Sequence, residues 1–207
     1  GIHHKIKQTQ VPSVVGLFKR ENDESPFLKA FTSYTSYWFN IEYWFKNTFT
    51  LHASVACLQI TMQNLNMFYS FIVTSRDKYF DCFIYPDISS LATLLENKVI
   101  NIYCIMKQDT ICAVYIFKTS EKDIVLINAI NTNNSIEFFI HGFYYCLERI
   151  YKPLGLANVR IEGLSHCSLI LQHILTVNST IRYSKTGWYL YNYGSETKES
   201  KKVFILI

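Results

Sequence analysis

The clearest pattern of hydrophobic and polar positions lies in the middle of the chain. Apolar residues dominate the segments 101–107 and 112–120, which predicts two β-strands joined by a tight turn at Gln108-Asp109-Thr110. The segment 124–131 is almost continuously apolar and predicts a third strand. Together these segments indicate a β-meander with a well-buried centre.

A helical pattern follows the third strand. Ser135 stands where an N-cap belongs, and Lys152-Pro153 marks the expected stop. Between them apolar residues recur at three- and four-residue spacing, typical of an amphipathic helix, at Ile136, Phe139, Ile140, Phe143, Tyr144 and Leu147. The remaining pattern of this half predicts a helix at 89–98, a strand at 158–164, a helix at 168–175 after a cap at Ser165, and strands at 188–193 and 203–207.

The first half of the chain follows a shortened version of the same order. It predicts strands at 14–20 and 26–34, a helix at 37–46, a strand at 54–60, a helix at 63–73 and a strand at 79–85. At a constant offset of 99 residues, Phe18 matches Phe117 and Phe39 matches Phe138. A period of this length is the size of a small domain, so we interpret it as a duplication of one half.

This interpretation divides the chain at Pro86-Asp87. We expect an N-terminal extension at 1–12, a partial first half at 13–86 and a second half at 87–207. Strands shared between the halves could instead fuse them into one continuous sheet. The expected fold class is α/β with a mixed sheet.

Composition and charge narrow the function classes. The chain has 207 residues, of which 49% are hydrophobic, so it can bury a substantial core. Its net charge of +4 is spread thinly rather than gathered in a stripe, which favours a protein or peptide partner over nucleic acid. Apolar runs are too short for a membrane span. Abundant Tyr, Phe, Ile and Asn are typical of AT-rich coding DNA, which suggests a virus or an organism with an AT-rich genome.

The cysteines and histidines show no spacing typical of a metal site. The six cysteines lie in apolar surroundings without a CxxC pair, which predicts buried free thiols rather than a disulfide framework. Free thiols indicate a reducing compartment such as the cytoplasm, which for a viral protein means the infected host cell, with the virion as the alternative.

The predicted order β-β-β-α-β-α-β-β, with the long helix after the third strand, resembles the GNAT acyltransferase fold. Two such units in one chain resemble the N-myristoyltransferase family, which is built from two fused GNAT-like halves related by a pseudo-twofold axis. The resemblance is best over 87–207. There, GWYLYNY, a polar hairpin and KKVFILI are similar to the family's "y-y-l-y-n-w" and final apolar strand.

The resemblance implies an acyl-CoA site, which the residues do not support. A CoA pyrophosphate needs free backbone N–H groups at a helix N-terminus, usually with Gly and basic side chains. The equivalent loops here are Ser33-Tyr34-Thr35-Ser36 and Thr132-Asn133-Asn134-Ser135, which contain neither Gly, Arg nor Lys. We therefore expect a degenerate member of the family without a bound cofactor.

Three positions correspond to catalytic groups implied by the resemblance. In the family the terminal carboxylate acts as a base, and the matching group here is the carboxylate of Ile207. A frayed or merely structural last strand is the favoured interpretation of this end. Thr61 or Cys57 could stand near the family's catalytic Thr, while Thr61 also fits a helix N-cap.

Two further sequence features bear on function, one of them with a structural explanation. In Ser165-His166-Cys167, adjacent side chains point in different directions, so we expect a cap, an exposed His and a buried Cys rather than a catalytic relay. The aromatic series from Tyr34 to Phe45 exceeds what one helix face needs and leaves surface for a partner or an apolar ligand.

The leading hypothesis is thus a non-catalytic protein- or peptide-binding module on an N-myristoyltransferase-like fold. The alternative is an acyl-CoA-dependent protein N-acyltransferase.

Overall fold

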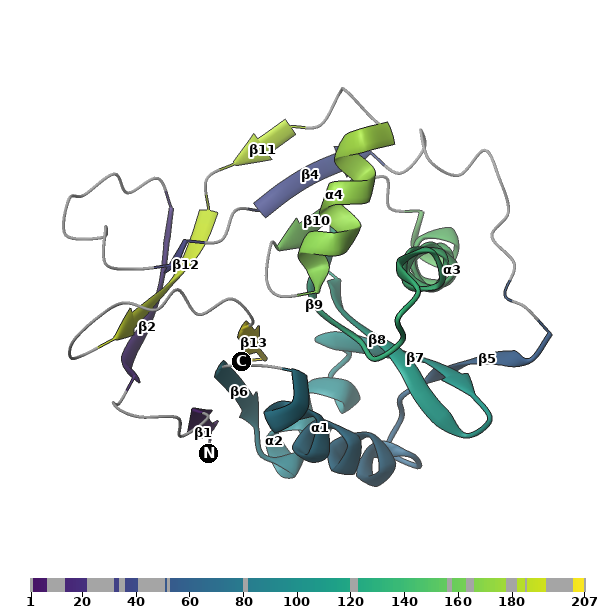
Figure 1. Cartoon of the computed structure of the whole chain (residues 1–207), viewed down its shortest axis with the longest axis horizontal. Helices are drawn as coiled ribbons and strands as arrows, with labels where there is room; N and C mark the ends of the chain where they lie inside the picture. Colours follow the sequence, from purple (N-terminus) through teal and green to yellow (C-terminus); the bar gives the residue numbers. More distant parts are fainter. Residues whose placement is uncertain are drawn as a thin grey trace.

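The computed structural model of the chain is drawn in Figure 1. It describes residues 2–6, 14–21, 32–33, 36–40, 51, 53–79, 82–119, 123–155, 158–162, 166–177, 182–184, 186–192 and 203–206. No helix in this part of the chain is both long and apolar enough to span a membrane.

A seven-stranded sheet forms the centre of the fold. Its strands lie in the order β11 (Arg182–Ser184), β4 (Ser36–Asn40), β10 (Asn158–Glu162), β9 (Asp123–Asn131), β8 (Thr110–Thr119), β7 (Ile100–Lys107) and β5 (Val55–Gln59). The pair β9 and β10 is parallel, and the other neighbours are antiparallel. The sheet is mixed, which confirms the predicted α/β class.

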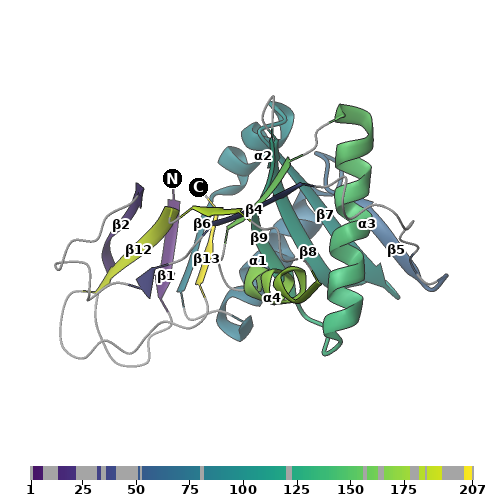
Figure 2. The same cartoon turned by 90° about the horizontal axis from the view of Figure 1, so that it is seen from above.

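Four helices cover this sheet in two layers. Figure 1 shows α1 (Leu65–Tyr79) and α2 (Ile88–Glu96) on one face, and α3 (Ile136–Leu154) and α4 (Cys167–Val177) on the other. Figure 2 shows α3 lying along the sheet and β5 at the outer end of the sheet. The central strands are apolar on both faces because each face is covered by helices.

Each face of the sheet has its own apolar core. Toward α3 and α4 the strands contribute Tyr103, Ile105, Tyr115 and Phe117, and toward α1 and α2 they contribute Ile102, Cys104, Val114 and Ile116. Alternate residues of β7 and β8 therefore enter opposite cores, as the two-residue period of a strand requires.

Two small sheets complete the fold. One consists of β1 (Ile2–Ile6), β6 (Cys82–Pro86) and β13 (Val203–Ile205), and the other of β2 (Val14–Glu21), β12 (Thr186–Asn192) and β3 (Thr32–Ser33). The polar hairpin between 188–193 and 203–207 predicts that these two strands pair with each other. This prediction is wrong, because β13 lies parallel to β6.

Most strands and helices of the second half lie where the sequence predicts them. Gln108 and Asp109, both with positive φ (49° and 60°), form the two-residue turn between β7 and β8. Ser135 caps α3 by accepting from the Phe138 N–H at 3.2 Å. The helix runs past Lys152-Pro153 and ends at Leu154, where left-handed Gly155 donates its N–H to the Tyr151 carbonyl.

One predicted helix of the first half is wrong. The segment 37–46 begins as strand β4, which pairs with β10 and with β11, and residues 41–46 lie outside the described part. Aromatic residues favour strands where a neighbouring strand is available, and β10 provides one. The match of Phe39 to Phe138 fails with it, since Phe39 lies in a strand and Phe138 in α3.

The seven-stranded sheet crosses the expected boundary at residue 86. β5 precedes that boundary and pairs with β7 beyond it, from Val55 opposite Lys107 to Gln59 opposite Tyr103. The shared-strand alternative describes this arrangement, and the division into 13–86 and 87–207 stays a prediction.

Candidate functional site

The described pairing between the parallel strands β9 and β10 ends before β9 does. It runs from Asp123 opposite Asn158 to Leu126 opposite Ile161, while β9 itself runs on to Asn131 and residues 163–165 after β10 lie outside the described part. We call the side of β9 beyond this described pairing the gap. At the same point the register between β8 and β9 shifts and leaves Ile127 without a partner residue on β8. An extra residue of this kind bends its strand, so β9 changes direction where its described pairing with β10 ends.

Two backbone N–H groups of β9 face this gap. Thr132 donates its N–H toward β8, to the Cys112 carbonyl at 3.0 Å. Because N–H groups alternate in direction along a strand, those of Ala129 and Asn131 point away from β8. These are the groups that a bound molecule in the gap would meet first.

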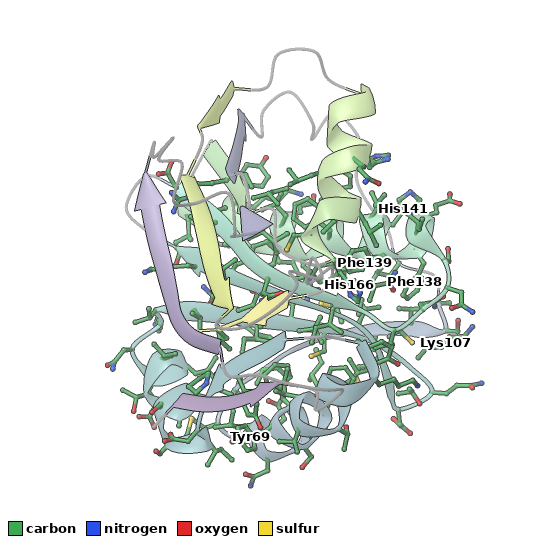
Figure 3. All side chains as sticks on the ribbon, turned by 60° about the vertical axis from the view of Figure 1, so that its left-hand side comes forward. Tyr69, Lys107, Phe138, Phe139, His141 and His166 are labelled. Atoms are coloured by element: carbon green, nitrogen blue, oxygen red, sulfur yellow. The ribbon has the colours of Figure 1, made fainter. Side chains whose placement is uncertain are left out.

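Both N–H groups already have acceptors within the chain. Ala129 donates to Asn128 Oδ1 at 2.9 Å, and Asn131 donates to His166 Nδ1 at 2.8 Å. Asn128 is fully buried, and His166, labelled in Figure 3, reaches β9 from the turn before α4. The edge of β9 that faces the gap is thus capped by side chains.

The loop from β9 to α3 is closed in the same way. Asn133 donates its N–H to Asn131 Oδ1 at 3.0 Å, and Ser135 donates its N–H to Asn133 Oδ1 at 2.9 Å. The first turn of α3 also carries the acidic residue Glu137.

An acyl-CoA pyrophosphate does not fit this loop. It needs free N–H groups and positive charge, whereas the loop's own side chains accept from these amides and Glu137 adds negative charge. The sequence indicated a poor pyrophosphate site only through the absence of Gly, Arg and Lys from this loop.

The candidate residues Cys57 and Thr61 lie at the other end of the sheet. β7 and β8 separate β5 from β9, and three strand spacings amount to about 14 Å. The structure therefore does not bring either residue to the gap. Ile207 lies outside the described residues.

Thr61 is not the N-cap of a helix. α1 begins at Leu65, and the exposed Thr61 donates its backbone N–H to Asn64 Oδ1 at 2.7 Å. The Asn64 amide in turn donates to the Gln59 carbonyl at 3.1 Å. Asn64 organises this turn, so the expectation that Thr61 caps a helix is wrong.

Cys57 contacts another thiol. Its Sγ lies 3.8 Å from Sγ of Cys146 in α3. A hydrogen bond from Cys146 lowers the pKa of Cys57, burial raises it in part, and the positive charge of Arg149 lowers it further. Burial raises the pKa of Cys146 well above the ordinary value.

The segment Ser165-His166-Cys167 forms no relay. His166 is half-buried rather than exposed as expected, because it accepts from Asn131, while Cys167 is fully buried as expected. Ser165 lies outside the described residues. Where side chains are described, no group of three or more His, Cys, Asp or Glu could hold a metal ion.

Sequence reasoning missed the residues that cap the gap. Asn128 stands as a polar residue inside the apolar run 124–130, and this interruption could have drawn attention to it. His166 gave no such signal, because its partner Asn131 lies 35 residues away.

The sequence matches no known protein-family model. No curated protein is significantly similar to it either.

Solved structures share the fold. A conserved protein of unknown function from Staphylococcus epidermidis is similar with a TM-score of 0.54 and 8% identity, over 86% of this chain and 72% of that one. A tandem GNAT protein from the clavulanic acid biosynthesis pathway has a TM-score of 0.49 and 9% identity, over 86% and 57%. A GCN5-related N-acetyltransferase from Kribbella flavida has a TM-score of 0.49 and 10% identity, over 85% and 43%.

The similar structures thus include GNAT-fold acetyltransferases. At these identities the similarity concerns the fold and not the activity.

Proposed function

We propose that this chain is a non-catalytic protein- or peptide-binding module on an acyltransferase-type fold. One observation carries the proposal: the N–H groups of Ala129 and Asn131, which face the gap between β9 and β10, are capped by Asn128 and His166. A ligand that paired with this edge would first have to break two internal hydrogen bonds, one of them to a fully buried side chain.

The closed loop before α3 supports the same proposal. The amides of Asn133 and Ser135 in this loop, and that of Phe138 in the first turn of α3, already donate to side chains of the chain, so a phosphate would gain little from the helix N-terminus. A protein or peptide partner is supported by the thin spread of the +4 net charge, which offers no stripe for nucleic acid. The free thiols support a reducing compartment such as the cytoplasm.

The alternative function is an acyl-CoA-dependent protein N-acyltransferase, similar to an N-myristoyltransferase. The observation that favours it is the gap itself, with the bulge at Ile127 beside it. In this alternative the donor site would have to be provided by another part of the protein, because the loop 132–135 does not fit a pyrophosphate.

A thermal-shift titration with acetyl-, myristoyl- and palmitoyl-CoA separates the two functions. A ligand raises the melting temperature only through its affinity for the folded state. The binding module should show no saturable rise with any of the three. A saturable rise of several degrees would support the acyltransferase, and a parallel titration with free myristate would separate binding of the acyl chain from binding of CoA.

A further inference from the structure

Two cysteines from different layers of the fold contact each other at the outer end of the sheet. Cys57 lies in β5, Cys146 lies in the middle of α3, and 89 residues separate them in the sequence. Their sulfur atoms are 3.8 Å apart, a distance at which one thiol donates to the other.

The two thiols differ in their access to solvent. Cys57 is partly exposed on β5, which forms one end of the seven-stranded sheet. Cys146 is 0% exposed and belongs to the core between α3 and the sheet. A small solute therefore approaches Cys57 more readily than Cys146.

Charge and hydrogen bonding also distinguish the two thiols. The hydrogen bond from Cys146 and the positive charge of Arg149, one turn further along α3, lower the pKa of Cys57, whereas burial raises that of Cys146. Tyr103, on the strand next to β5, stays a neutral phenol, because burial raises its pKa to about 12. Cys57 is thus the more readily ionised thiol of the pair, and Cys146 lies within hydrogen-bond distance of it.

We propose that Cys57 and Cys146 form a dithiol switch that hydrogen peroxide or a related hydroperoxide oxidises to a disulfide. The Cys57 thiolate attacks one peroxide oxygen, so that an S–O bond forms, the O–O bond breaks and hydroxide leaves. Cys57 is then a sulfenic acid, and the peroxide has accepted two electrons.

Cys146 completes the reaction. Its sulfur attacks Sγ of Cys57, the S–S bond forms, the S–O bond breaks, and the departing hydroxide takes the Cys146 proton. In total two thiols and one peroxide yield one disulfide and two waters. The sulfur atoms must close from 3.8 Å to about 2 Å, and the resulting bond joins β5 to α3.

Cys112 provides a matched control within the same chain. It is also partly exposed, but its Sγ donates to the Thr110 carbonyl at 3.6 Å, so nothing in this contact stabilises a thiolate. Comparing Cys57 with Cys112 therefore separates thiolate character from exposure.

The first test is alkylation of the reduced, folded chain by iodoacetamide, read for each cysteine by peptide mass spectrometry. Each tenfold gain in the thiolate fraction raises the rate only about threefold, because nucleophilicity falls with the pKa. Cys57 should therefore react faster than Cys112, by a factor of about this order. Equal rates, or a faster Cys112, would overturn the proposal.

The second test is oxidation by a small excess of hydrogen peroxide. The expected product is a monomer with one disulfide between the peptides of Cys57 and Cys146, reversed by dithiothreitol and melting several degrees higher because it closes a long loop. Cys146→Ser, which keeps a hydrogen-bond donor beside Cys57, should accumulate a sulfenic acid at Cys57 that dimedone traps, and Cys112→Ser should behave like the original chain. A disulfide between other cysteines, a disulfide between two chains, or no dimedone adduct in Cys146→Ser would each overturn the proposal.

Discussion

The contact between Gly142 and Tyr115 provides a sharp test of how α3 is seated on the sheet. A Cβ added at Gly142 would lie 2.6 Å from the Tyr115 hydroxyl oxygen and 3.1 Å from Cγ1 of Ile105. The same hydroxyl donates to the Phe139 carbonyl at 2.5 Å, so it cannot move aside without losing that bond.

Opposing effects set the magnitude for Gly142→Ala. Alanine favours the helix by about 1 kcal/mol over glycine. Overpacking a full core costs about 1–3 kcal/mol, and displacing the fully buried Tyr115 hydroxyl adds about 1–3 kcal/mol for an unsatisfied polar group. We expect Gly142→Ala to lower the free energy of unfolding by about 2 kcal/mol, measured by urea unfolding followed by circular dichroism.

Tyr115→Phe supplies the matched background. It removes the oxygen at 2.6 Å and leaves Ile105 as the nearest contact, at 3.1 Å. In this background Gly142→Ala should be neutral or slightly stabilising, so the double-mutant cycle should give a coupling of about 2 kcal/mol. An equal loss of stability in both backgrounds would refute the reasoning.

Three further predictions concern stability. Leu206→Ala should lower the free energy of unfolding by about 2–4 kcal/mol, because Leu206 is 2% exposed and packs in the core beside α1 and α2; a loss within error in urea unfolding would show that it is not a core residue. Ser135→Ala should cost about 1 kcal/mol by removing the cap of α3, and Ser135→Asp, which retains a capping oxygen, should restore most of it. Burial, and then the charge of His141, lower the pKa of His173. Neutral His173 therefore contributes stability above its unfolded pKa of about 6.5, and this contribution is lost as the pH falls through the folded pKa. Melting temperature should therefore fall with pH below about 6.5, and His173→Gln should weaken that dependence; an unchanged slope would contradict the assignment.

The best predictions from the sequence are those of strands and a helix whose local residue pattern is enough to determine their secondary structure. Strands β7, β8 and β9 have apolar runs with a clear turn between the first two, and α3 has both a cap at Ser135 and a regular apolar stripe. Local pattern and tertiary packing agree in these segments, so the pattern suffices.

The segments it did not predict depend on distant partners. Residues 36–40 become a strand beside β10, which lies more than a hundred residues further along the chain, and the last strand pairs with β6 rather than with its neighbour in sequence. Aromatic-rich and short apolar segments fit both helix and strand, so the partner decides.

The candidate site was predictable only in part. The missing Gly and basic residues in the loop 132–135 indicated a poor phosphate site from sequence alone. The hydrogen bond from Asn131 to His166 and the contact of Cys57 with Cys146 join residues 35 and 89 positions apart, and no local pattern encodes such pairs.

Amide hydrogen exchange at Ala129 and Asn131, followed by NMR, tests the central claim most directly. Because Asn128 and His166 accept from these two N–H groups, both should exchange slowly in the free chain, and His166→Ala should speed exchange at Asn131 while leaving Ala129 slow. Addition of acetyl-CoA should change neither rate in the original chain. Fast exchange in the free chain that slows saturably with acetyl-CoA would show that the gap is an open cofactor site, and would contradict the account.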